Sequence, residues 1–265
     1  MGSSASDSLF TSLLDNYRNT FKTFLKDIKE LKKNIFEAFS AEKEIENKRE
    51  QLEIDSAVLS TGLPPAISQL TSFNENFGKC TEGFIKELRE DQRSFLGSIL
   101  SEERRVQRVE LLFRASVHGF SAKAFHEKCD NQEDTLVLVR TEFGKTIGGY
   151  THYPWKSVGG DGERVNHSGR RAFLFSLDMR EKFVPQGDDY LIYRYSDYGP
   201  NFGDDDIGIC DGCNSNSDSF ADFPKTYNRA GGNKLARNED TYRMFSGSSY
   251  YFRVVEYEVF RVWYS

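Results

Sequence analysis

The stretch Leu111–Asn131, LLFRASVHGFSAKAFHEKCDN, separates a helical part of the chain from a part that is rich in β-favouring residues. We expect a short helix from about Ser121 to Cys129, because Ser121 is a favourable N-cap residue. One side of this helix is apolar and consists of Phe120, Ala124 and Phe125. The stretch therefore predicts a structural join between two parts of the chain, and it specifies no reaction.

Residues 9–110 are predicted to form a helical coiled-coil arm that follows a disordered, Ser-rich tail at residues 1–8. Apolar residues recur there at alternating steps of three and four, which keeps one stripe facing a partner helix. They are Leu14, Tyr17, Phe21, Phe24, Ile28, Leu31, Ile35 and Ala38. We expect a break near residues 61–65, where one glycine and two prolines interrupt the helix. A less regular second helix should then end at Leu111–Phe113, before a turn at His118–Gly119.

The apolar pattern of this arm predicts that the chain self-associates through the coiled coil. Folding back of its two helices as a hairpin within one chain is a second arrangement that the break allows. The number of chains joined is left open by the pattern.

Charge and cysteine content restrict the partners and the compartment. The formal net charge is −6, and no block of basic residues is present to neutralise phosphates, so nucleic acid is not an expected partner. Four cysteines without a hydrophobic signal sequence favour reduced thiols in the cytoplasm. Gly2, followed by Ser6, matches the myristoylation pattern, which would place the chain at a membrane only if Gly2 is acylated.

After Asn131 the hydrophobic pattern changes to that of short strands joined by Gly-, Asp- and Asn-rich turns, which is typical of an antiparallel sandwich. Strands are predicted over residues 135–140, 146–151, 172–177, 190–195, 206–210 and 250–264. Gly148 and Gly149 lie inside a strand pattern and should permit close packing. Lys156–Arg170 contains a cluster of Gly, Asp and Glu residues and predicts a flexible polar loop.

Five marks in order give residues 111–265 a resemblance to the TLDc domain family. They are the Leu111–Asn131 opening, Gly148–Thr151 with Pro154–Trp155, Ala172–Leu177, Gly199–Gly203 with Asp206–Ile207, and Phe252–Phe260. The resemblance implies an α+β chain in which long N-terminal helices precede an antiparallel two-sheet β-sandwich with short flanking helices. It implies no established catalytic triad and no cofactor.

Few residues are candidates for metal or thiol chemistry. Cys210 and Cys213 form a CxxC pair, and Cys129 with His126, three apart on one predicted helix, would complete a set of zinc ligands. The alternative is that Cys129 is a small core residue and that the CxxC pair flanks a turn. Acidic and amide residues between Asp204 and Asp218 resemble calcium ligands, or else form a solvated turn.

We therefore expect a non-enzymatic interaction or regulatory protein that displays a TLDc-like domain on an oligomerising arm. The family resemblance implies a role in the oxidative-stress response or in binding and regulating the vacuolar-type proton ATPase. Two alternatives stay open, a thiol-dependent enzyme of peroxide handling that uses Cys129 or the Cys210/Cys213 pair, and an acylated membrane-associated scaffold.

Overall fold

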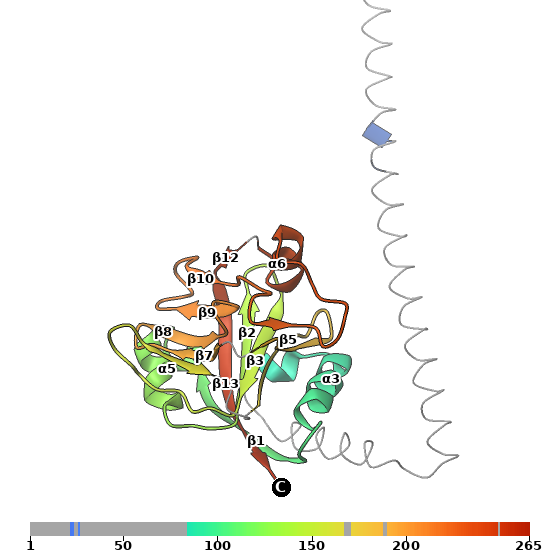
Figure 1. Ribbon diagram of the computed structural model, residues 1–265. Helices are drawn as coiled ribbons and strands as arrows, with labels where there is room; N and C mark the ends of the chain where they lie inside the picture. The colour runs from blue at the N-terminus through green and yellow to red at the C-terminus, as the bar shows by residue number, and fades with distance from the viewer. Residues whose placement is uncertain (1–21, 24–25, 27–83, 167–170, 188–189, 249) are drawn as a thin grey trace, which may run out of the picture. The chain divides into compact units, whose positions relative to one another are not determined.

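The structure is a computed structural model, and it describes residues 22–23, 26, 84–166, 171–187, 190–248 and 250–265 (Figure 1). The predicted tail, Gly2, the break near residues 61–65 and most of the predicted coiled-coil arm lie outside these residues; of the arm, residues 22–23, 26 and 84–110 are described. Lys22, Thr23 and Lys26 are helical, but three residues do not test whether helices pair. None of the described helices combines the length and apolar character needed to cross a membrane.

Two antiparallel sheets form the domain, as the sequence predicts for this α+β chain. The larger sheet has the order β1 (Val106–Arg114), β13 (Val254–Tyr264), β2 (Thr135–Thr141), β3 (Thr146–Thr151), β5 (Ala172–Ser176), β6 (Glu181–Pro185) and β11 (Tyr227–Asn228). The smaller sheet has the order β12 (Tyr251–Phe252), β10 (Ser219–Phe220), β9 (Ile207–Cys210), β8 (Tyr198–Phe202), β7 (Tyr190–Arg194) and β4 (Glu163–Asn166).

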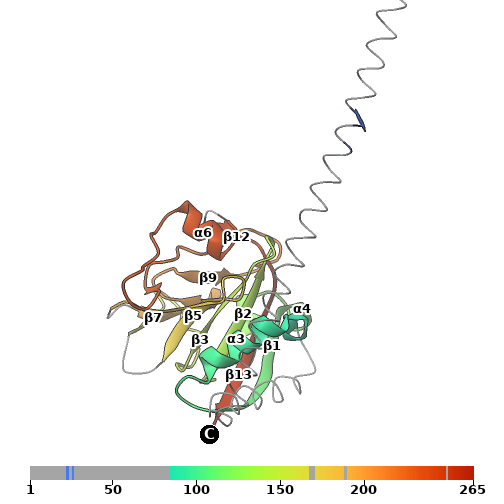
Figure 2. The same ribbon diagram turned by 90° about the vertical axis from the view of Figure 1, so that its right-hand side faces the viewer.

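The seven-stranded sheet is buried on both faces. Alternate side chains of one strand point to opposite sides, so each strand contributes to two cores. Val137 and Val139 of β2 belong to the core between the two sheets, whereas Leu136 and Leu138 belong to a second core. That second core is covered by the short helix η1 (Phe84–Glu87) and by α3 (Glu90–Leu100). Figures 1 and 2 show α3 on the side of this sheet that faces away from β9.

The domain thus includes residues that the sequence pattern assigned to the arm. The prediction that a helix ends at Leu111–Phe113 is wrong, because β1 pairs with β13 across these residues. Two shifts of register interrupt the pairing, so the buried residues Val106, Val109 and Phe113 are spaced by three and four. Such β-bulges break the alternation of a strand and produce the spacing of a helix.

The join itself matches the sequence more closely. Helix α4 (Ala115–His118) ends at Gly119, which adopts a positive φ of 102°, and α5 (Ala122–Cys129) follows. The Ser121 side chain accepts a hydrogen bond from the Ala124 amide at 3.2 Å, which confirms its role as N-cap. Phe125 is fully buried and packs edge-on against Trp155.

Two further segments differ from the sequence-based prediction. Within the predicted polar loop at Lys156–Arg170, residues Glu163–Asn166 form β4, which pairs with β7 at the edge of the six-stranded sheet. The structure also contains a helix that was not predicted from the sequence, α6 (Glu239–Phe245), which is capped by the Asn238 side chain.

Candidate functional site

His126, one of the predicted zinc ligands, has both ring nitrogens occupied by hydrogen bonds. Nδ1 lies 2.7 Å from the Asp130 carboxylate, and Nε2 lies 3.0 Å and 3.1 Å from the carbonyl oxygens of Tyr195 and Tyr198. Because both nitrogens contact oxygen atoms of the protein, neither is open to a metal ion in this arrangement. His126 instead joins α5 to the turn between β7 and β8.

The three described cysteines are all buried. Cys129 and Cys213 are fully enclosed in the core between the sheets, and the Cys210 Sγ lies 3.0 Å from the Asn216 side-chain oxygen. Burial raises the pKa of all three thiols above its ordinary value. Because the thiolate is the reactive form, the described cysteines have the environment of inert core thiols. No three His, Cys, Asp or Glu side chains gather as a metal site in the part of the chain that the structure describes.

The acidic stretch considered for calcium has other roles. Asp206 is fully buried and accepts backbone hydrogen bonds from Lys225, Thr226 and Tyr227 at 2.7–3.2 Å. Burial raises the pKa of Asp206 to about 7, and the three amides oppose that shift. Its carboxyl group therefore fixes the segment that follows β10.

Glu256 and Glu258 share a face of β13, and both are buried rather than solvated. The Arg114 Nε lies 3.4 Å from Glu256 and 3.3 Å from Glu258. Glu258 also accepts a hydrogen bond from the Phe84 amide at 2.8 Å. These carboxylates position η1 and the end of β1, and their side chains are engaged in structural contacts.

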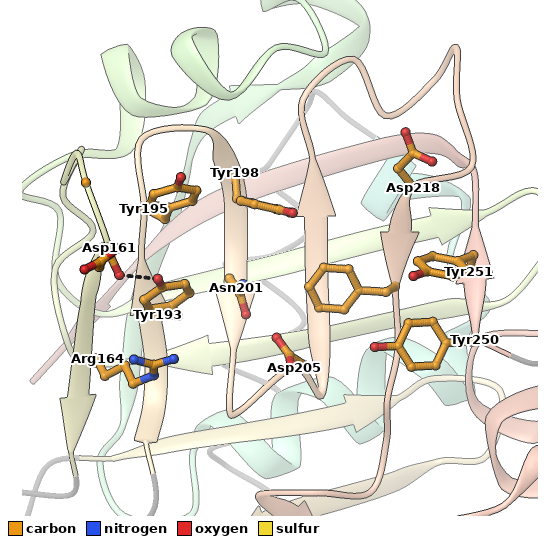
Figure 3. Close-up of a pocket in the computed structure, with 12 residues that line it drawn as sticks. Asp161, Arg164, Tyr193, Tyr195, Tyr198, Asn201, Asp205, Asp218, Tyr250 and Tyr251 are labelled. Atoms are coloured by element: carbon orange, nitrogen blue, oxygen red, sulfur yellow. Dashed lines mark hydrogen bonds between the residues drawn. The ribbon is translucent and has the colours of Figure 1, made fainter.

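A hollow among the described residues lies on the face of the six-stranded sheet that points away from the other sheet (Figure 3). We call it the tyrosine groove, and its volume is about 870 Å³. Its aromatic lining is Tyr193, Tyr195, Tyr198, Phe220, Tyr250 and Tyr251. Successive rings in this order have centroids 4.6–6.2 Å apart, so they form one continuous row across the sheet.

Carboxylates outnumber cations around the tyrosine groove. Asp161, Asp205 and Asp218 line it together with a single cation, Arg164. Lys225 Nζ lies 3.6 Å from Asp205, whereas Asp161 and Asp218 form no ion pair with any described residue. Both of these unpaired carboxylates are exposed, so the groove has a rim of negative charge.

Three tyrosines of the groove have a pKa raised above its ordinary value, so they keep their hydroxyl protons at neutral pH. The nearby Asp197 carboxylate raises the pKa of Tyr195, and burial raises the pKa of Tyr198 and of Tyr250. The rings therefore present neutral aromatic faces, which attract cations through their quadrupole.

Asn201 on β8 lines the groove between Tyr198 and Asp205 (Figure 3). Only 2% of its surface is exposed, and its Oδ1 atom is buried without a hydrogen-bond partner among the described residues. A buried oxygen left without a donor costs about 1–3 kcal/mol. A ligand that brings an N–H or O–H group into the groove would remove that cost.

The groove was not among the sites predicted from the sequence. Tyr193 and Tyr195 lie two apart at the end of β7, so their shared face was available as a signal. Phe220 and Tyr250 come from separate strands and loops, and only the order of strands in the sheet brings them beside Tyr198.

The comparison with known protein families agrees with the extent of the fold. The TLDc domain model matches residues 82–263, more than half of the chain, and begins just before η1. No curated protein matches this chain. The matched segment contains both sheets except the last residue of β13, together with α3 and every residue of the tyrosine groove. The chain therefore belongs to the TLDc domain family.

Proposed function

We propose that the chain is a non-enzymatic, regulatory interaction protein whose TLDc domain binds a protein partner through the tyrosine groove. The observation that carries this proposal is the row of six neighbouring aromatic rings left open on a sheet face. Aromatic residues are enriched at protein interfaces, where they provide large contact areas at low entropic cost. The buried thiols and the engaged carboxylates described above favour binding over catalysis.

The family supports a role in the oxidative-stress response, and the vacuolar-type proton ATPase is the partner that we propose. Self-association through the predicted coiled coil would present more than one groove to that partner and raise its avidity. Attachment to a membrane through an acylated Gly2 would be compatible with the same role.

Affinity purification of the full-length chain from its native cells tests the proposal. We expect recovery of proton ATPase subunits with the natural chain and their loss with Tyr195→Leu, which removes the ring between Tyr193 and Tyr198. Asp240→Asn serves as the control, because Asp240 is an exposed residue of α6 that does not line the groove. Equal recovery of the same proteins with all three chains would contradict binding through the groove.

A further inference from the structure

The length of the tyrosine groove sets the kind of ligand that it accommodates. Its lining residues extend from Arg164 on β4, at one edge of the six-stranded sheet, to Tyr251 on β12 at the other. Neighbouring strands lie about 4.8 Å apart, so the five spacings between six strands correspond to roughly 24 Å. An extended peptide that rises about 3.3 Å per residue covers this length with about seven residues.

The negative charge of the rim favours extended peptides that carry positively charged side chains. Asp161 and Asp218 lie in the lining without a partner cation among the described residues, and both are accessible. The face already holds one guanidinium group on its aromatic row, since the Arg164 Cζ atom lies 5.2 Å from the ring centroids of Tyr190 and Tyr193. Arginine stacks on aromatic faces and pairs with carboxylates more readily than lysine does.

Asn201 adds an independent requirement at the centre of the groove. Its buried Oδ1 lacks a donor among the described residues, so a ligand in the groove can supply one. The N–H groups of a peptide backbone or of a guanidinium both meet this need.

From these features we infer that the tyrosine groove binds an extended, arginine-containing segment of a partner protein. Arginine side chains of the segment stack on the tyrosine rings and pair with Asp161 and Asp218. An N–H group of the segment donates a hydrogen bond to Asn201 Oδ1. This inference rests on the proposed protein-binding function and names the chemistry of the partner at that site.

Fluorescence anisotropy with the full-length chain and a labelled Arg–Gly repeat peptide tests this chemistry. The matched probe is a citrulline–Gly peptide, which keeps the shape of arginine and lacks its charge. We expect the arginine peptide to bind at least tenfold more tightly, with an affinity that falls as salt is added because the rim charges are exposed. Equal binding of the two peptides would overturn the inference.

Variants of the groove test each contact separately. Asp161→Asn and Asp218→Asn should each weaken binding up to about fivefold, as expected for exposed ion pairs. Tyr195→Leu should weaken it about threefold or more by removing a cation–π contact, whereas Tyr195→Phe should retain affinity. The control Asp240→Asn should bind like the natural chain, and a loss of affinity equal to that of Asp218→Asn would contradict the assignment.

The variant Asn201→Leu distinguishes an effect on peptide binding from an effect on folding. Replacing the unpaired amide with an apolar side chain of similar shape should leave thermal stability equal or higher, while peptide affinity falls about fivefold. Retained affinity in this variant would refute the role of Asn201.

Different results would refute the protein-binding function and the arginine chemistry of the groove. Loss of cellular partners with Tyr195→Leu, together with no binding of the arginine peptide, would refute the arginine chemistry and leave the protein-binding role in place. Binding of an oligosaccharide that the same variant abolishes, with no peptide bound, would also overturn the inference. Partner recovery that is unchanged by Tyr195→Leu would refute the proposed function itself.

Discussion

Gly148→Ala is expected to destabilise the domain strongly, because β2, β3 and β5 leave no room for a side chain at this position. A Cβ atom on Gly148 would lie 2.0 Å from the Val137 carbonyl oxygen and 2.7 Å from the Phe175 ring. The oxygen belongs to the backbone of the paired strand, so the sheet itself would have to open. Overpacking costs about 1–3 kcal/mol, and contact with a fixed backbone atom places this change at the upper end, about 3 kcal/mol.

The free energy of unfolding can be measured in urea by tryptophan fluorescence, since the buried Trp155 reports on the core. For a domain of this size the expected loss corresponds to a melting temperature lower by roughly 6–12 °C. Gly159→Ala is the matched control, because a Cβ atom on Gly159 would meet nothing within 4 Å. It should be neutral or stabilise by about 0.5 kcal/mol. A Gly148→Ala variant as stable as Gly159→Ala would refute the reasoning.

Three further predictions concern buried groups. Because burial raises the pKa of Asp206 to about 7, its contribution to stability is fully present below the unfolded pKa and is lost as the pH rises through 7. The free energy of unfolding should therefore decline between pH 5 and 8, and the Asp206→Asn variant should show a smaller decline. An equal decline in this variant would contradict the raised pKa of Asp206. Glu258→Ala should cost about 3 kcal/mol and accelerate hydrogen exchange at the Phe84 amide, and unaltered exchange there would show that this bond does not hold η1. Cys129 and Cys213, whose thiol pKa values are raised by burial, should resist alkylation in the native state and react once unfolded, as read by peptide mass spectrometry; rapid native labelling would favour the thiol-dependent alternative.

Local sequence patterns predicted the strands whose pairing is regular. The segments that became β2, β3 and β5 are runs of β-branched, aromatic and glycine residues, and their registers continue without a shift. β1 was misassigned because its two bulges space Val106, Val109 and Phe113 like one face of a helix. Local periodicity therefore fails where a bulge resets the alternation.

The candidate site could be predicted from the sequence to a smaller extent than the strands, because it depends on tertiary structure. The sequence indicated Cys210 and Cys213 by their spacing, but burial and not spacing decides whether a thiol is reactive. Tyr195, Phe220 and Tyr251 become neighbours in one groove only because their strands lie side by side in the six-stranded sheet. No local pattern carries that information.

Site-specific photo-crosslinking tests the central claim most directly, namely that the tyrosine groove is the surface that binds a partner. A photoreactive phenylalanine derivative placed at Tyr251, which is 58% exposed, should capture the partner in cells. The same group at Val117, which is 68% exposed on α4 and does not line the groove, should capture none. Capture from position 251 alone is the predicted result. No capture from position 251, or the same product from both positions, would contradict the account.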